Sequence, residues 1–200
     1  MIQLMGGEQA FITKMDSLFT MHLPDEFFAE TEDVTKEGLL GGYVHGNEPS
    51  HHIPFLYTWT SQPWKTQYWQ REIMNKMYRN NIDGLCGNDD CGQMSAWYIL
   101  SAIGILSGLP GYGSIRIRRS LPSLYEGPLG EWQDFEVKAD KVSDKNRYVK
   151  AVKLNGKPYT KGYITQDDIM NGGTLTFEMT SSPNKKRLFN GEDRPYSLTD

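Results

Sequence analysis

The fold class is decided by residues 93–118, which read QMSAWYILSAIGILSGLPGYGSIRIR. The first part of this stretch repeats large or buried-type side chains at the spacing of one helix face, at Met94, Trp97, Tyr98, Ser101 and Ile105. This pattern predicts a helix from Gln93 to about Leu106. After residues 108–113, isoleucines 115 and 117 alternate with arginines, which is the period of a β-strand. The sequence therefore predicts an α+β chain, with a helical part at residues 1–108 and a β-rich part at residues 109–200.

Two more helices are expected in the helical part. Apolar side chains recur at helical spacing over residues 8–19, after a Gly6-Gly7 break. Pro63 suits the first position of a second helix, because its missing N–H would have no partner there. That helix is predicted to run to about Tyr78, with an inward stripe of Trp69, Ile73 and Met77.

The β-rich part contains a hairpin signal and an alternating strand. Asn155-Gly156 favours a two-residue hairpin turn, since both residues tolerate positive φ. Apolar and polar residues alternate over residues 174–179, so one face of that strand is predicted to be buried. Between them, Thr165 and Asp168 resemble a capping box at a helix start. The sheet is expected to be antiparallel, and the residues from Lys185 onward to form a polar tail.

Composition excludes several classes of protein. The 200 residues are 38% hydrophobic and 23% charged, which is typical of a folded globular chain. The net charge of −4 and the scattered basic residues provide no positive surface for nucleic acid. No apolar run approaches the roughly 20 residues that a membrane-spanning helix needs. Residues 1–11 lack the features of a secretory signal.

The two cysteines, Cys86 and Cys91, lie in one short loop. No second pair is present to complete a zinc site. A local disulfide would need an oxidising compartment, and two buried free thiols are the favoured interpretation.

A first polar loop, residues 45–52, reads HGNEPSHH. Asn47 and Glu48 offer the hard oxygen ligands that calcium prefers, and the neighbouring imidazoles could hydrogen-bond a polyol. The structural alternative is that Asn47 caps a turn, Glu48 is solvated and the histidines are ordinary loop residues.

A second polar loop, residues 87–92, reads GNDDCG and directly precedes the helix at Gln93. A carboxylate at a helix N-terminus is stabilised by about 0.3–1 kcal/mol, which favours its ionised form. Inverting glycosidases use one such carboxylate as a base on water and a second carboxylic acid as proton donor. The alternative is that Asp89 or Asp90 is a helix cap and has no other role.

Three motifs in order resemble glycoside hydrolase family 92, a family of calcium-dependent, inverting, exo-acting α-mannosidases. They are GGYVHGNEPSHH at residues 41–52, QPWKTQ at residues 62–67 and DGLCGNDDCGQMSAWY at residues 83–98. Residues 154–159 and 182–186 also look like the carboxy-terminal segment of the family. The resemblance implies that the helical part belongs to an (α/α)6 catalytic toroid, which this chain contains only in part.

The resemblance also implies roles for individual residues. Asp90 matches the general base that activates water, with Asn88 or Asp89 orienting it. Asn47 and Glu48 match part of the calcium and mannose site. The implied sugar contacts are His45, Glu48, Asn88, Trp64 and Lys65, although a packing role for Trp64 is an equal alternative.

One catalytic group of the family is expected to be missing. The family's general acid is a Glu in a Glu-Gly-x-x-Trp type of motif, and neither Glu37-Gly38 nor Glu126-Gly127 continues in that way. We therefore expect an N-terminal portion to be missing and the isolated chain to be inactive. A partial toroid would also leave apolar helix faces unburied, so self-association or a separate partner chain is expected. The other hypothesis is a non-catalytic carbohydrate-binding or assembly module. Resemblance to the family further predicts a mannose-containing glycan as partner and a periplasmic, cell-surface or secreted location.

Overall fold

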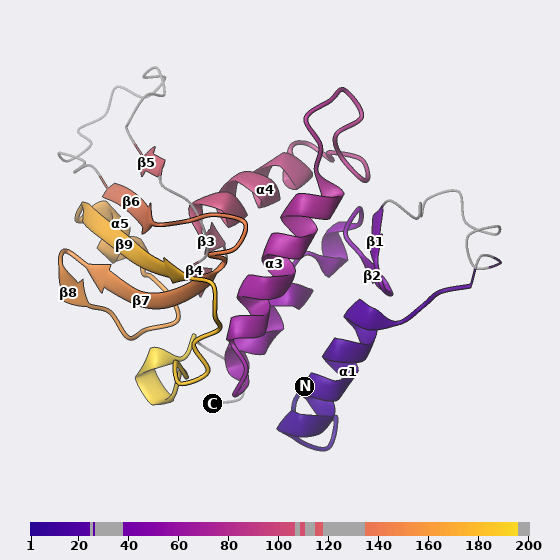
Figure 1. Ribbon diagram of the computed structural model, residues 1–200, viewed down its shortest axis with the longest axis horizontal. Coiled ribbons are helices and arrows are strands. Elements are labelled where there is room, and N and C mark those ends of the chain that lie inside the picture. Colours follow the sequence, from indigo (N-terminus) through magenta and orange to yellow (C-terminus); the bar gives the residue numbers. More distant parts are fainter. Residues whose placement is uncertain (25, 27–37, 107–108, 111–114, 118–134, 196–200) are drawn as a thin grey trace. The chain divides into compact units, whose positions relative to one another are not determined.

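A computed structural model describes residues 1–24, 26, 38–106, 109–110, 115–117 and 135–195 (Figure 1). The chain divides into two compact units, Met1–Ile99 and Leu100–Asp200. The predicted boundary at Gly108 lies outside the described residues. Helices and strands both occur, so the α+β prediction is confirmed.

The first unit is built mainly from helices. In chain order its elements are α1 (Glu8–Thr20), β1 (Leu39–Leu40), β2 (Tyr43–Val44), η2 (Glu48–Ser50), η3 (Ile53–Trp59), α3 (Trp64–Met77) and the first turns of α4 (Gln93–Ile103). The three predicted helices are confirmed. Pro63 directly precedes α3 and already has helical dihedral angles, with φ −63° and ψ −20°.

The end of α4 differs from the prediction. Gly104 adopts a left-handed conformation with φ 88°, which stops the helix because glycine carries no Cβ to oppose that angle. Ile105 and Leu106 consequently form strand β3 (Ile105–Leu106), which pairs with β4 (Leu109–Pro110). Met94, Trp97 and Ser101 are buried as expected, whereas Tyr98 is 39% exposed.

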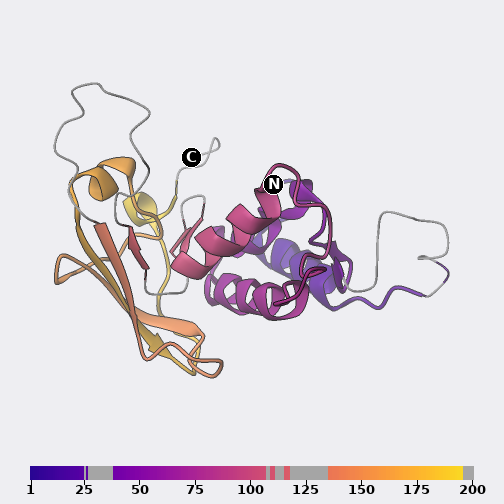
Figure 2. The same cartoon turned by 90° about the horizontal axis from the view of Figure 1, so that it is seen from above.

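Aromatic side chains join α1 to α3 in the first unit. The rings of Phe19 and Trp69 stack with centroids 4.6 Å apart, and Phe19 also contacts Tyr43 at 5.0 Å. Ile73 and Met77 of the predicted stripe are buried, and Trp69 is half-buried. Figures 1 and 2 show the two helices side by side. The first polar loop, residues 45–52, therefore directly follows a well-packed part of the first unit.

The second unit holds a five-stranded sheet in the order β5-β6-β9-β7-β8, and its strands are labelled in Figure 1. Its strands are β5 (Ile115–Ile117), β6 (Phe135–Asp140), β7 (Tyr148–Leu154), β8 (Lys157–Pro158) and β9 (Gly173–Thr180). The predicted hairpin joins β7 to β8, and Thr165 caps the short helix α5 (Gln166–Met170) with the predicted capping box.

The expectation of a purely antiparallel sheet is wrong. β9 pairs antiparallel with β7 but parallel with β6. Because β6 and β7 run in opposite directions and β9 lies between them, one of its two pairings must be parallel. The placement of β9 between β6 and β7 brings together segments that are distant in the sequence. The local periodicity of each strand does not predict this placement.

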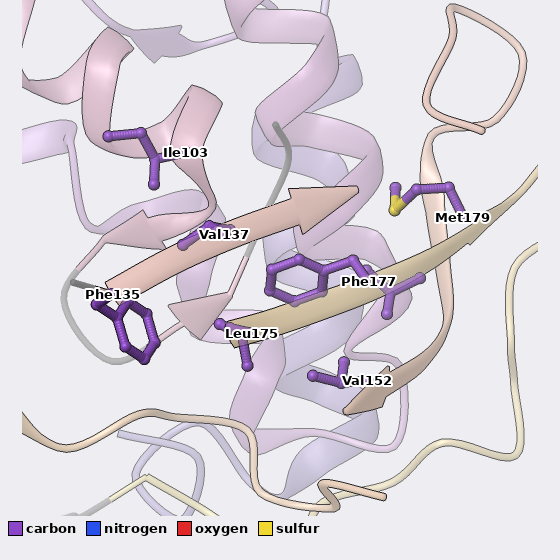
Figure 3. Close-up of a cluster of buried hydrophobic side chains, with 8 residues drawn as sticks. Ile103, Phe135, Val137, Val152, Leu175, Phe177 and Met179 are labelled. Carbon is purple, nitrogen blue, oxygen red and sulfur yellow. The ribbon is translucent and has the colours of Figure 1, made fainter. Parts of the chain in front are cut away.

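The core of the second unit lies on one face of this sheet (Figure 3). The alternation predicted for residues 174–179 is confirmed, since Leu175, Phe177 and Met179 are all buried. They pack with Ile103, Phe135, Val137, Val149 and Val152.

The end of the described chain packs on the same unit. Phe189 is buried against Gly162, where an added Cβ would lie 3.0 Å from the ring. The amide of Gly162 donates to the carbonyl oxygen of Asp193 at 2.8 Å. The residues from Lys185 onward thus include a buried aromatic anchor, where a polar tail was predicted. Within the described residues, no helix is both long and apolar enough to cross a bilayer.

Candidate active site

The two turns that carry the predicted site residues lie against each other. A Cβ added to Gly46 would lie 2.6 Å from the carbonyl oxygen of Cys86, and one added to Gly87 would lie 2.6 Å from that of Gly46. The backbones are therefore in direct contact, and no side chain fits between them. This contact makes the Asn47/Glu48 turn and the Asp89/Asp90 turn neighbours, as the sequence interpretation required.

The Asp89/Asp90 turn has an unusual backbone. Asp90 and Cys91 have φ values of 43° and 60°, and Gly92 follows at 90°. Residues with a Cβ seldom adopt this left-handed region, and such outliers cluster at functional sites. The turn ends where α4 begins, with the amides of Gln93 and Met94 donating to the carbonyl oxygens of Asp90 and Asp89.

The two adjacent aspartates have different partners. The Asp89 carboxylate accepts a hydrogen bond from the Ser95 amide at 2.9 Å, so it caps the first turn of α4. The Asp90 carboxyl is exposed and shares a hydrogen bond with Glu48 across the two turns. The capping alternative therefore describes Asp89, while Asp90 faces the other polar turn.

The contact between the two carboxyl groups shifts both of their pKa values. The hydrogen bond and the negative charge of Glu48 raise the pKa of Asp90. The same hydrogen bond lowers the pKa of Glu48. Two carboxyl groups this close need a shared proton or a nearby cation, because their negative charges repel each other.

His45 lies beneath the site. It is buried, and burial lowers its pKa to about 3, so the ring is neutral at ordinary pH. Its Nδ1 lies 2.9 Å from the Tyr43 hydroxyl and its Nε2 lies 2.7 Å from the Tyr78 hydroxyl. Each ring nitrogen thus has a tyrosine hydroxyl as its hydrogen-bond partner. The buried histidine supports the Asn47/Glu48 turn from the interior of the unit.

His51 and Trp97 connect the first turn to α4. The Nε2 of His51 lies 2.9 Å from the carbonyl oxygen of His45, so this nitrogen carries the proton and donates it. The indole N–H of Trp97 donates to the carbonyl oxygen of His51 at 3.2 Å. Residues 45–51 are held in place by buried groups, which leaves Asn47 exposed and Glu48 partly exposed.

Trp64 and Lys65 begin α3, apart from the contact between the two turns. The Lys65 ammonium forms an ion pair with Asp16 of α1, and the Tyr57 hydroxyl donates to the same carboxylate at 2.9 Å. The ammonium also lies 5.7 Å from the centre of the Trp64 ring. These contacts give Lys65 a role in joining α1 to α3, and the role of Trp64 stays a prediction.

A cavity of about 440 Å³ lies in the first unit, and Asn47, Glu48, Asp89 and Asp90 are not among the residues that line it. Ser95, whose amide binds Asp89, lies on its wall beside Tyr78 and Tyr98. The rest of the lining consists of Arg79, Asn80, Asn81, Ile82, Gly84 and Leu85.

The side chains at the two turns offer oxygen atoms, which are the ligands that a hard cation such as calcium prefers. Asn47 supplies an amide oxygen and Glu48 a carboxylate, with the Asp90 carboxyl beside it. In the described part of the chain, no three His, Cys, Asp or Glu side chains form a group that could hold a metal by themselves. Calcium takes six to eight oxygens, so water, backbone or sugar oxygens would have to complete such a site.

The cysteines are both free, as expected. Cys86 is half-buried, and burial raises its pKa to about 11. Cys91 is exposed, so the expectation of two buried thiols is wrong.

The sequence analysis did not identify the tyrosines that surround His45. Tyr43 begins strand β2 and His45 directly follows that strand, so continued alternation would place both side chains on one face. That signal could have found Tyr43. Tyr78 was assigned only as the end of a helix, and nothing local indicates that its hydroxyl reaches His45.

Comparisons with known proteins agree on one family. The model of the "Glycosyl hydrolase family 92 catalytic domain" matches residues 1–181. An uncharacterized secreted glycosidase of Arthroderma benhamiae is 26% identical over 205 residues, which cover 99% of this chain and 23% of that protein.

Solved structures give the same result. The family GH92 α-mannosidase BT3965 of Bacteroides thetaiotaomicron is 41% identical, with a TM-score of 0.78 over 96% of this chain and 25% of that one. Its complex with mannoimidazole gives a TM-score of 0.80. The family GH92 inverting mannosidase BT2199 of the same organism is 30% identical, with a TM-score of 0.77 over 99% of this chain and 28% of that one. The chain thus spans about a quarter of the length of the relatives it matches.

Proposed function

Since this chain belongs to glycosyl hydrolase family 92, we propose that it forms part of an exo-acting α-mannosidase that hydrolyses terminal α-mannosides with inversion. The observation that carries the proposal is the contact of the Asp89/Asp90 turn with the Asn47/Glu48 turn. The relative described as an inverting mannosidase and the mannoimidazole complex of another relative support the reaction and the sugar.

Asp90 is the proposed general base. Its carboxyl is exposed, its pKa is raised by Glu48, and the left-handed turn holds it beside the first polar loop. A raised pKa makes the carboxylate a stronger acceptor for the proton of an attacking water. Asp89 positions this base by fixing the turn to α4, and Asn88 lies exposed beside both aspartates.

Asn47 and Glu48 are the proposed calcium ligands and mannose contacts. Their donors fit calcium in type, and a cation would relieve the repulsion between Glu48 and Asp90. When bound, calcium would stabilise negative oxygens near the sugar hydroxyls. Glu48 would then orient the sugar relative to Asp90, while the buried His45 holds the turn and does not touch the substrate.

Other parts of the proposal concern the whole enzyme. The helices of the first unit would belong to an (α/α)6 toroid, and the general acid would come from a portion outside this sequence. The relative described as a secreted glycosidase supports export to the periplasm, cell surface or medium. The isolated chain is expected to be inactive.

The test replaces Asp90 in a preparation that contains the chain together with the upstream portion found in the family. Asp90→Asn should lower kcat on an aryl α-mannoside by about 10²–10⁴-fold, the usual contribution of a positioned base. Mannoimidazole affinity, measured by calorimetry, should change little. Proton NMR of the first product should show inversion at the anomeric carbon.

Asp83→Asn is the matched control, because Asp83 is an exposed aspartate in the preceding loop. It should retain full activity. Near-normal turnover by Asp90→Asn would remove Asp90 from the mechanism. Mannose binding by the complete preparation without any turnover would instead favour a carbohydrate-binding module.

A further inference from the structure

The Tyr78 hydroxyl bonds to both halves of the candidate site. It lies 2.7 Å from Nε2 of His45, in the first loop, and donates to the carbonyl oxygen of Met94, in the first turn of α4, at 3.1 Å. Tyr78 itself lies just after α3. One hydroxyl group therefore joins three segments that are separate in the sequence.

The proton positions in this chain of bonds follow from the acceptors. A carbonyl oxygen can only accept, so the single Tyr78 proton points to Met94. The Nε2 of His45 must then carry a proton and donate it to Tyr78. In the neutral ring Nδ1 is the acceptor, and it receives the Tyr43 proton. The bonds thus run in one direction, from Tyr43 through His45 and Tyr78 to the start of α4.

Packing fixes the Tyr78 ring independently of its hydroxyl. The ring is nearly parallel to that of Trp97, with centroids 6.1 Å apart and an interplanar angle of 2°. It also contacts the ring of Tyr98 at 4.8 Å. Removing the hydroxyl alone should therefore leave the ring in place and break only the bonds.

We propose that Tyr78 is a positioning residue that holds the Asp89/Asp90 turn in register with the Asn47/Glu48 turn. Met94 is tied by its own amide to the carbonyl oxygen of Asp89, and His45 lies two residues before Asn47. A shift of either segment changes the distance between the proposed base and the proposed sugar contacts. The kinetic consequence rests on the proposed function, whereas the structural link between the two turns does not.

The test compares two tyrosines that bind the same histidine. Tyr78→Phe removes the bonds to both segments, while Tyr43→Phe, the matched control, removes a buried bond to His45 only. In the active preparation, Tyr78→Phe should lower kcat about tenfold with KM within about twofold, because misplacement of a reacting group slows the chemical step. Tyr43→Phe loosens only the first segment, so its loss of kcat should be clearly smaller than that of Tyr78→Phe.

Amide hydrogen exchange on the chain itself provides a second measurement that needs no activity. Tyr78→Phe should increase exchange in both Gly46–Ser50 and Asp89–Ser95, and Tyr43→Phe in the first segment only. Equal kcat losses in the two variants, or unchanged exchange at Asp89–Ser95 in Tyr78→Phe, would overturn the inference. A wild-type preparation without mannosidase activity would instead contradict the proposed function, and the exchange result would still decide the role of Tyr78.

Discussion

Asp89 and Asp90 are chemically identical neighbours with different tasks. Asp89 accepts the Ser95 amide and caps α4, while Asp90 faces Glu48. The difference arises from the backbone, since Asp90 lies in the left-handed region at φ 43°. At the scale of single residues, conformation therefore decides which carboxyl is available for chemistry.

Removing the cap should destabilise the first unit. Asp89→Ala should lower the free energy of unfolding by about 1 kcal/mol, the usual effect of losing a helix cap. Asp89→Asn keeps an oxygen that can accept the Ser95 amide, so its stability should stay close to wild type. Urea denaturation followed by circular dichroism measures both. Equal losses in the two variants would show that the negative charge matters more than the hydrogen bond.

The two thiols should differ in their response to pH. With a pKa of about 11, Cys86 is almost entirely a thiol at pH 8, and only the thiolate is alkylated. In Cys91→Ser, alkylation by iodoacetamide should therefore be about 100-fold slower at pH 8 than that of a model thiol at the reference pKa of 9.0. The rate should rise steeply as the pH approaches 11, as followed by mass spectrometry. A plateau below pH 9 would contradict the raised pKa.

At the scale of elements, the turn between β7 and β8 depends on Asn155. Its φ of 51° is followed by 78° at Gly156, as a two-residue hairpin turn requires. Its side-chain oxygen accepts the Thr174 amide at 2.8 Å, and its own amide donates to the Thr174 carbonyl. The hairpin turn is thereby fixed to β9.

Replacing Asn155 should weaken this arrangement. Asn155→Ala loses the acceptor for the Thr174 amide and strains the left-handed position, so it should destabilise the second unit by about 1–2 kcal/mol. Lys157→Ala, at an exposed position of β8, should stay within about 0.5 kcal/mol. Urea denaturation compares them. A loss below about 0.5 kcal/mol in Asn155→Ala would show that the turn contributes little.

Elements specified by local sequence could be predicted, and elements specified by distant contacts could not. α1, α3, the capping box at Thr165 and the Asn155-Gly156 hairpin each follow from residues within a few positions. The parallel pairing of β6 with β9 depends on which strand enters the gap beside β6. No pattern of neighbouring residues in the sequence predicts which strand pairs with β6.

The same distinction applies to the candidate site. The sequence identified both polar turns, and the resemblance to the family implied that both belong to one site. Residue types alone could not separate Asp89 from Asp90, because that difference depends on backbone angles, and only the resemblance singled out Asp90. It also assigned His45 a sugar contact, whereas burial between Tyr43 and Tyr78 places that ring under the site.

At the scale of the whole molecule, each unit has its own hydrophobic core. Phe11, Ile12 and Ile73 are buried in the first unit, and Phe177 lies at the centre of the sheet core in the second. A defect in one core should therefore affect the amides of its own unit most strongly.

Phe177→Ala tests this independence. Truncating a buried Phe costs about 3–5 kcal/mol, which is enough to expose the amides of β6, β7 and β9 to exchange. Protection in α1 and α3 should remain close to wild type, as measured by hydrogen exchange with mass spectrometry. Parallel loss of protection in both units would mean that they unfold together.

The touching glycines at positions 46 and 87 also limit how this protein can be varied. Each would direct its first side-chain carbon into fixed main-chain atoms, and neither has a positive φ that would explain glycine in another way. When either codon is randomised, every alternative amino acid should push the two loops apart. Functional clones recovered from such libraries should encode glycine at both places, and grafting one loop onto another scaffold will require its companion as well.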